Sequence, residues 1–433
     1  MSENKVPISV ITCDMEGRIE TFNKGAEEIF GYTADEVVDK KRVSLFSPGL
    51  VVLGYVPMWL DEASKKGEYS TETTFVRKDG SQLAASVKIT PTMKDGVQIG
   101  YCGTTTPLPD KSPEETMPPT AFATKIISVV AITRIPFLTA TWIPILAAAA
   151  WANSAGLGID MVNFWIAFLA GSMLHLAANT YNDYFDWTSG TDQENNDYFL
   201  QLSGGSRAIE LGLISEQGLF KLANTFLALS AVMGVTIMYL LSDNGHNGYE
   251  LAYYGIFGAF SAYFYTGTPF RLVARRGLGE LLIGLNFGPV MTMGTVFAIT
   301  GEHSWIAFMI GIPLGLLTTA ILWINQFPDM ESDIKSGKNH LVATIGLKNA
   351  SYGYLALMIA AFVSLILLHQ EGHVKDGGLL MLLATPIAAF ASFKALTEYD
   401  KRELAIANWA TIGIHFVAGA LFSIGLQYNI NIF

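Results

Sequence analysis

The stretch FWIAFLAGSMLHLAANTYNDYFD, residues 164 to 186, begins as an apolar run and ends in two carboxylates. A run of this length, with no Asp, Glu, Lys or Arg before its end, can cross the hydrocarbon core of a bilayer. Asp183 and Asp186 lie three residues apart, so a helical end places both side chains on one side. The stretch therefore predicts a membrane-spanning helix with an acidic cluster at one membrane surface.

A second acidic cluster follows another apolar segment. LLTTAILWI, residues 316 to 324, leads into Asn325, Asp329 and Asp333. Carboxylates at the end of a span are costly unless a cation neutralises them, and Mg²⁺ takes hard oxygen ligands together with substrate phosphates. Ordinary solvated loop charges would explain one Asp pair better than two clusters on the same side. The clusters predict a diphosphate site, with nearby basic residues suited to the remaining phosphate oxygens: Arg207, Arg271 and Lys338.

Apolar stretches recur through the rest of residues 121 to 433. Segments such as LALMIAAFVSLILL are apolar all round, whereas a helix of a soluble bundle keeps one polar face. Nine stretches are long enough to span a bilayer, at roughly 124–150, 160–182, 218–241, 249–266, 278–300, 303–326, 350–369, 376–397 and 404–427. The pattern predicts an all-α, polytopic membrane domain of nine transmembrane helices.

Basic residues are distributed unevenly over the loops and span ends. One side carries Arg207, Lys221, Arg271, Arg275, Arg276, Lys335, Lys338, Lys348, Lys394, Lys401 and Arg402, whereas the opposite loops carry only Lys375. Because Lys and Arg are enriched on the cytoplasmic side of membranes, both acidic clusters and the N-terminus are expected there. The expected location is the inner (cytoplasmic) membrane.

Residues 1 to 106 are polar and rich in charge. The net charge of −11, with no Lys/Arg-rich block, argues against a nucleic-acid partner. Cys13 and Cys102 are the two cysteines of the chain; they form no disulfide framework and no metal-type spacing, which favours a reducing cytosol. The start, MSENKVPISV, lacks the basic and apolar regions of a cleavable signal. A cytosolic domain is therefore expected in front of the membrane part.

This N-terminal part alternates short strands with turn residues. Asp79-Gly80 and Asp95-Gly96 are typical of hairpin turns, and residues 23 to 38 carry apolar side chains at helical spacing. The segments that favour strands are 8–13, 17–22, 71–77, 82–90 and 97–104. The pattern predicts an α+β domain in which helices pack on an antiparallel sheet.

The motifs of this domain occur in a characteristic order. Asp14-x-x-Gly17-x-Ile19-x-x-x-Asn23, then Phe30-Gly31-Tyr32 and Arg77-Lys78-Asp79-Gly80, resemble a PAS domain. The resemblance implies a sensor that binds a small ligand or pairs with another copy. The first His of the chain is His175, so a His-ligated haem is not expected here. We expect a regulatory role or a homodimer contact, with the ligand unidentified.

A proline-rich segment separates the two parts. PLPDKSPEETMPP, within residues 107 to 120, contains five prolines and several charges, which favours an extended linker. The predicted organisation is multidomain: a PAS-like domain at 1–106, a linker at 107–120 and a membrane domain at 121–433.

The two acidic motifs of the membrane domain have a recognisable form. Asn182-Asp183-x-x-Asp186 and Asp329-x-x-x-Asp333 resemble those of the UbiA superfamily of intramembrane aromatic prenyltransferases. NDYFDWTSGTD, GGSRAIELGLIS, YTGTPFRLVARRGLGE and NQFPDMESDIKSGKNHLVATIG are similar to the branch that prenylates 1,4-dihydroxy-2-naphthoate in menaquinone synthesis. Many members place a third acidic residue where Gly190 stands, and Asp192 is the candidate for that role.

This resemblance implies a helical bundle around a cavity open to lipid, in which two Mg²⁺ ions bridge a polyprenyl diphosphate to both motifs. Diphosphate departs, an allylic cation forms away from water, and an electron-rich aromatic carbon attacks it. The implied metal ligands are Asp183, Asp186, Asp192, Asp329 and Asp333, with Asn182 and Asn325 assisting. The implied substrate-binding residues are Arg134, Asn179, Arg207, Tyr265, Arg271 and Lys338; Arg134 matches an arginine of the family's first span and suits the acceptor carboxylate or the diphosphate.

Other functions stay open at the level of sequence. Another acceptor, such as 4-hydroxybenzoate, a tetrapyrrole or a glycerol-phosphate lipid, would use the same acidic motifs. A membrane-anchored sensor or transporter without catalysis is the alternative of another class, although both Asp pairs are intact. The prenyl chain length is not predicted, because many apolar side chains are candidates for the cavity wall.

Overall fold

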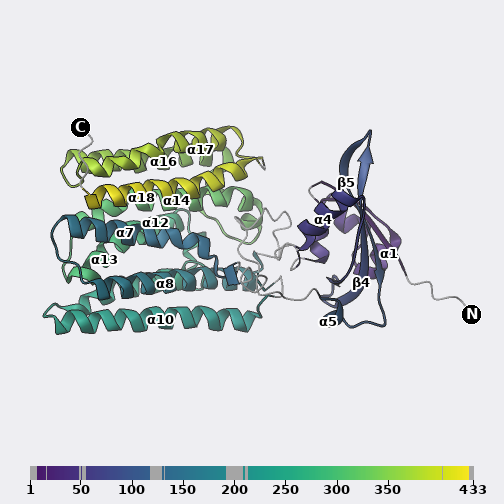
Figure 1. Cartoon of the computed structure of the whole chain (residues 1–433), viewed down its shortest axis with the longest axis horizontal. Coiled ribbons are helices and arrows are strands. Elements are labelled where there is room, and N and C mark those ends of the chain that lie inside the picture. The colour runs from purple at the N-terminus through teal and green to yellow at the C-terminus, as the bar shows by residue number, and fades with distance from the viewer. Residues whose placement is uncertain are drawn as a thin grey trace, which may run out of the picture. The chain divides into compact units, whose positions relative to one another are not determined.

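The computed structural model describes residues 7–15, 17–47, 50, 55–117, 129–130, 132–191, 208–209, 213–401 and 403–428. The chain forms two compact units, Met1–Ile132 with Ala208–Ile214, and Thr133–Arg207 with Ser215–Phe433. Figure 1 shows that the first unit is built on a β-sheet and the second on long helices. Each unit is described by itself below.

The N-terminal unit contains an antiparallel sheet of five strands in the order β2-β1-β5-β4-β3. The alternating pattern of the sequence thus predicted the sheet correctly. Its strands are β1 (Ser9–Asp14), β2 (Ile19–Phe22), β3 (Tyr69–Val76), β4 (Gln82–Lys94) and β5 (Val97–Pro107). The turn between β4 and β5 has positive φ at Asp95 and Gly96, as the Asp-Gly pair requires.

Helices α1 (Lys24–Phe30), α2 (Ala34–Val37) and α4 (Tyr55–Lys66) share one apolar core with the sheet. The Asn23 side chain caps α1 by accepting a hydrogen bond from the Ala26 N–H at 2.8 Å. Phe30 and Trp59 are both buried in this core. The unit therefore has the α+β architecture expected from the sequence.

The predicted linker is partly ordered. Residues Pro113–Thr116 form one helical turn, α5, instead of an extended chain. The Thr74 hydroxyl on β3 donates to the Pro113 carbonyl at 2.5 Å and lies 2.9 Å from the Thr116 hydroxyl. The first part of the proline-rich segment thus packs on the sheet, because Pro is well tolerated in the first turn of a helix.

The second unit is all helical. Its main helices are α7 (Thr139–Ser154), α8 (Met161–Thr188), α10 (Glu216–Asp243), α11 (Leu251–Phe264), α12 (Leu278–Leu285), α13 (Met291–Thr300), α14 (Trp305–Lys335), α15 (Leu341–Ile345), α16 (Leu347–Gln370), α17 (Thr385–Thr397) and α18 (Leu404–Tyr428). A π-helical segment, Asn286–Val290, joins α12 to α13, and a 3₁₀ segment, Asp376–Ala384, precedes α17. In Figure 1, α10 lies at one edge of the bundle beside α8.

Seven helical segments of the described residues are long and apolar enough to cross a membrane. They account for seven of the nine predicted spans. The other two predicted spans contain α7, of 16 residues, and α11, of 14 residues, which are shorter than a typical span. Nine spans are therefore not confirmed, but the unit is that of an integral membrane protein.

Small residues allow α14 to approach the preceding helix closely. Gly284 and Gly288 face Gly311 and Gly315, and a Cβ on Gly288 would lie 2.4 Å from the Gly311 carbonyl oxygen. Both pairs have a spacing of four, which is typical of tight helix contacts in membranes. These contacts fix α14, whose C-terminal end carries the second acidic cluster.

Candidate active site

The two acidic clusters lie in the last turns of the two longest helices near the site, α8 and α14. Asp183 and Asp186 belong to α8, which continues to Thr188, and Asp333 lies two residues before the end of α14. Carboxylates at a helix C-terminus oppose the helix dipole, so this placement does not stabilise the helices. The carboxylates at these helix ends must therefore be stabilised by the groups around them.

Helix α14 reaches the site in spite of a proline. Pro328 has no N–H, so the carbonyl of Ile324 loses its helical partner. The Asn408 side chain, on α18, donates to that carbonyl at 3.2 Å and to the Asn325 Oδ1 at 2.8 Å. This compensation keeps α14 helical up to Asp329 and Asp333.

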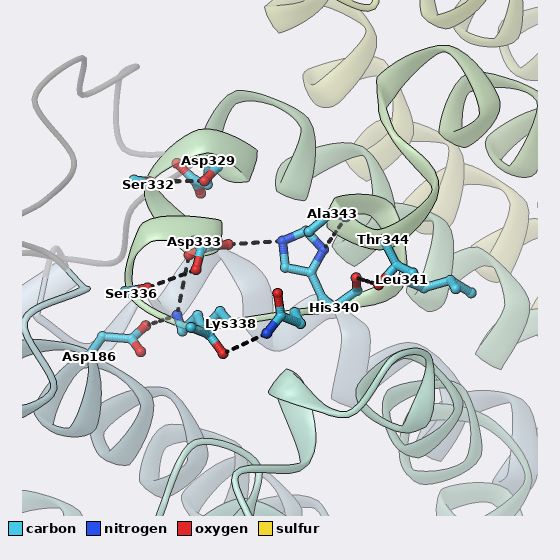
Figure 2. A network of polar contacts seen from close by, with 12 residues as sticks. Asp186, Asp329, Ser332, Asp333, Ser336, Lys338, His340, Leu341, Ala343 and Thr344 are labelled. Atoms are coloured by element: carbon cyan, nitrogen blue, oxygen red, sulfur yellow. Dashed lines mark hydrogen bonds and ion pairs between the residues drawn. The ribbon is translucent and has the colours of Figure 1, made fainter.

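Lys338 joins the two clusters. Its Nζ lies 2.7 Å from Asp186 Oδ2 and 3.8 Å from Asp333 Oδ1. Figure 2 shows the ammonium group between the two carboxylates, one from α8 and one from α14. Asp186 is 152 positions from Lys338 in sequence and Asp333 is five positions from it, yet both carboxylates lie beside the same ammonium nitrogen.

His340 holds the opposite side of Asp333. Its Nδ1 accepts a hydrogen bond from the Ala343 N–H at 3.1 Å, at the start of α15. The proton must therefore be on Nε2, which donates to Asp333 Oδ2 at 3.1 Å. Sequence reasoning missed this residue, and its short distance from Asp333 along the chain, in GKNHL, was the available signal.

The network is almost closed to solvent. Side-chain exposure is 8% for Asp186, 9% for Lys338, 11% for Asp333 and 1% for His340. Removing one partner from such a buried pair costs about 3–5 kcal/mol, because the other charge stays buried without compensation. Buried charge of this kind, at the end of membrane helices, marks a functional site.

Glu280 supports the same loop and was also missed. This buried residue in the first turn of α12 accepts a hydrogen bond from the Leu341 N–H at 2.9 Å through Oε1. The Arg276 N–H donates to the Asn339 carbonyl at 3.1 Å. The loop that carries Lys338 and His340 is therefore held by Arg276, just before α12, and by Glu280, in the first turn of α12.

The structure describes two of the three remaining predicted metal ligands, Asp183 and Asp329. Asp183 is buried, and Asp329 is half-buried one turn before Asp333. Within the described ranges, no group of three or more His, Cys, Asp or Glu side chains is close enough to hold a metal ion as it stands. Asp192 and Arg207 lie outside the described residues. The five-ligand set therefore stays a prediction.

The donor chemistry nevertheless fits a hard cation. Asp186 and Asp333 approach one positive group from two helices, and Asp183 and Asp329 add carboxylates on the same helix ends. Carboxylate oxygens are the ligands that Mg²⁺ takes in proteins, usually together with water and phosphate oxygens. The residues present are therefore compatible with Mg²⁺ at this position.

A cavity of about 230 Å³ lies inside the bundle, and its lining includes Asn182 and Asn325, which are close in sequence to the two acidic clusters. Five predicted site residues line it: Arg134, Asn179, Asn182, Tyr265 and Asn325. Most of its wall is apolar, with aromatic rings from Phe137 and Phe287. A cavity with a charged end and an apolar body suits a ligand that has an anionic head and a hydrocarbon tail.

Two polar groups on this wall have no hydrogen-bond partner among the described residues. They are Arg134 Nε and the Tyr265 hydroxyl, and both atoms are buried. The Arg134 guanidinium lies over the Phe137 ring, 5.0 Å from its centroid. Because buried polar groups normally have a partner, these two atoms are suited to contact a ligand.

Two predicted arginines have unusual backbone geometry. Arg134 has φ of 54° and Arg271 has φ of 40°, in the left-handed region that side chains other than Gly rarely adopt. Such conformations cost about 1–3 kcal/mol and cluster at functional sites. Arg271 also interacts electrostatically with Asp186, which places it beside the network.

His175 is a further cavity residue that sequence reasoning missed. It lies on α8 one turn before Asn179, and its Nδ1 is 2.7 Å from the Thr141 hydroxyl on α7. Its ring packs against Phe287 with centroids 4.8 Å apart. A lone His inside a span gave no motif, so only the tertiary structure reveals its place.

Known proteins resemble both units. The UbiA prenyltransferase family model matches residues 141–418, and a PAS domain model matches residues 7–105. A 2-carboxy-1,4-naphthoquinone phytyltransferase from Synechocystis is 26% identical over 71% of this chain and 95% of its own length. A 1,4-dihydroxy-2-naphthoate octaprenyltransferase from Bacillus subtilis is 25% identical over 68% of this chain and 90% of its own length.

Among solved structures, a UbiA homolog from Archaeoglobus fulgidus bound to DMAPP and Mg²⁺ is 15% identical, with a TM-score of 0.47. It matches 69% of this chain and 99% of its own length. The family model covers well over half of the chain, including both acidic motifs. The protein is therefore a prenyltransferase of the UbiA family with a PAS domain at its N-terminus.

Proposed function

We propose that this enzyme transfers a polyprenyl group from its diphosphate to 1,4-dihydroxy-2-naphthoate within the membrane, a Mg²⁺-dependent step of menaquinone synthesis. The observation that carries the proposal is the buried Asp186–Lys338–Asp333 network beside a largely apolar cavity. An isoprenoid diphosphate has the matching anionic head and apolar tail. The names of the Synechocystis and Bacillus relatives support a naphthalene-type acceptor.

Departure of the diphosphate is the step that the network would assist. Mg²⁺, held by Asp183, Asp186, Asp192, Asp329 and Asp333, would neutralise the negative charge that develops on the leaving group. Lys338, Arg271 and Arg207 would hold the remaining oxygens. Asn325 accepts from Asn408 through Oδ1, so its Nδ2 is the side-chain donor left for substrate at the cavity wall.

The cavity would host the carbon chemistry. The C–O bond of the donor breaks with its electron pair on the diphosphate, and an aromatic carbon of the acceptor attacks the allylic cation. The carboxyl group at that ring carbon then leaves as CO₂. Apolar lining keeps water from the cation, and Arg134, with its buried Nε, would orient the acceptor carboxylate.

The membrane arrangement belongs to the same proposal. The short helices α7 and α11 would complete nine spans when their flanking segments are included. The excess of Lys and Arg near the acidic clusters favours a cytosolic site and a cytosolic PAS domain, in the inner membrane. The PAS domain would regulate the enzyme or mediate a homodimer.

The direct test is transfer by the purified full-length enzyme with Mg²⁺, a polyprenyl diphosphate and 1,4-dihydroxy-2-naphthoate. We expect a prenylated, decarboxylated naphthoquinol, identified by mass spectrometry, and no product after Mg²⁺ is chelated. 4-Hydroxybenzoate serves as the parallel acceptor. Product from the benzoate alone would overturn the proposed acceptor. If no diphosphate is released with either acceptor, the proposed activity is wrong.

A further inference from the structure

A second cavity of about 330 Å³ adjoins the first. Helices α8, α10, α11 and α13 supply most of its wall, and nearly all of the side chains are apolar. The two cavities share five lining residues: Gly171, Leu174, Gly258, Asn286 and Met291. We call this second cavity the distal chamber, because it continues the first one away from the carboxylates.

The order of the lining residues along two helices shows this direction. On α8 the distal chamber is lined from Ala167 to Leu174, and the first cavity from Gly171 to Asn182, next to Asp183. On α11 the distal chamber begins at Leu251, and the first cavity extends to Tyr265 just beyond the helix. From Ala167 to Asn182 the axis of α8 rises by about 22 Å, so the two cavities together have the length for several isoprene units.

The outer wall of the distal chamber faces the membrane. Helix α10 is the least buried of the seven candidate spans, with 11% of its window inside the protein. Val235 on α10 and Ile256 on α11 line the chamber and are 62% and 68% exposed. An apolar ligand in the chamber would therefore leave no hydrocarbon in contact with water.

Two glycines line this chamber and have open space beside them. Gly234 on α10 and Gly255 on α11 both line it, and a Cβ built on either would meet no atom within 4 Å. Gly234 and Gly255 are not among the described glycines with positive φ, so their backbone conformation does not require Gly. Gly inside a helix costs about 1 kcal/mol relative to Ala, and at these two positions the gain is open volume.

We propose that the distal chamber holds the far isoprene units of a long prenyl diphosphate, and that Gly234 and Gly255 determine the chain length that the enzyme accepts. This inference rests on the proposed function, because the first cavity and the carboxylates bind the diphosphate end. Continuity between the two cavities selects the donor tail as the occupant over an unrelated membrane lipid.

The test compares two donors in the full-length enzyme with Mg²⁺ and 1,4-dihydroxy-2-naphthoate. Gly234→Leu and Gly255→Leu each place an apolar side chain in the distal chamber. We expect kcat/KM for octaprenyl diphosphate to fall at least about tenfold, since filling an apolar pocket by a few methylenes has effects of this size. Turnover of geranyl diphosphate, which the first cavity accommodates, should stay within about twofold.

Gly413→Leu is the matched control. Gly413 is also helical, on α18, has no atom within 4 Å of a built Cβ, and lines neither cavity. Its substitution should leave the ratio of the two donors unchanged. If both chamber variants keep the wild-type ratio, the chamber does not set chain length and the inference is wrong.

A binding experiment separates this inference from the proposed function. An octaprenyl diphosphate analogue with a photoreactive group at its tail end should label α10 and α11 in the wild type, and Gly255→Leu should abolish that labelling. Labelling of α7 or α18 instead would overturn the inference even if prenyl transfer is observed. Labelling of α10 and α11 by a photoreactive phospholipid that the donor analogue does not displace would also overturn it.

Discussion

Helix α14 connects two polar networks of opposite character. At its start, Glu250 Oε2 lies 2.5 Å from His303 Nε2, and His303 Nδ1 lies 2.7 Å from the Tyr254 hydroxyl. At its end, about 45 Å away along the helix axis, Lys338 and His340 contact Asp333. The side chains of Glu250 and His303 are 32% and 39% exposed, whereas those at the other end are nearly closed to solvent.

This difference separates a structural network from a functional one. Partly exposed charges keep much of their hydration, so the Glu250–His303 pair needs no function to explain it. Buried charges lose hydration, and a well-packed apolar core would often be as stable. Charge is therefore retained around Asp333 for chemistry, and the two ends of α14 should respond differently to substitution.

Removing a carboxylate at the buried end should have the largest effect. Asp186→Asn and Asp333→Asn each keep the shape of the side chain but remove the negative charge that suits a cation. We expect kcat/KM to fall at least about 1,000-fold, measured as prenyl transfer at saturating Mg²⁺. Thermal unfolding should show that both variants stay folded, and turnover within tenfold of the wild type would contradict their assignment to the site.

Lys338→Met should lower activity by about 100-fold, the size expected when one donor to a developing anion is lost. The loss should include a higher KM for the prenyl diphosphate, because the ammonium group is expected to contact its oxygens. Lys335→Met is the matched control, since Lys335 is three residues away, ends α14 and is exposed. Equal effects of the two substitutions would show that only general positive charge matters.

His340 is a positioning residue, because it acts through Asp333. His340→Ala should reduce kcat/KM by about 10–100-fold, as is usual for groups that orient ligating carboxylates. In His340→Gln the side-chain amide can still donate to Asp333, so we expect most of the activity to return. Failure of Gln to rescue, with both variants equally unstable to heat, would assign His340 to the stability of the loop alone.

The sequence predicted the buried end well wherever the signal was local. The spacing of Asp183 to Asp186 and of Asp329 to Asp333 was enough to predict two acidic helix ends, and the structure places both pairs there. The spans were predicted to end near residues 182 and 326, whereas α8 and α14 extend to Thr188 and Lys335. Hydropathy marks only the apolar part of a helix, so it could not predict this extension.

Residues that act through tertiary contacts were not predictable in the same way. Lys338 was expected to bind phosphate, but its contact with Asp186 depends on how α8 and α14 pack. Glu280 meets the Leu341 N–H across 61 positions of sequence, and His175 has no motif around it. Such residues are found only when the fold shows that a polar group is buried.

At the exposed end of α14, substitutions should have the smallest effects. Glu250→Gln weakens the contact between Glu250 and His303, and His303→Ala removes the contacts of His303 with both Glu250 and Tyr254. In both variants water can replace the lost partner. We expect a loss of about 0.5–1 kcal/mol in the free energy of unfolding, which is the usual size for a partly exposed pair. Prenyl transfer should stay within about twofold of the wild type. A larger loss of activity, with unchanged stability, would mean that this end of the bundle also takes part in the reaction, and burial would no longer separate the two networks.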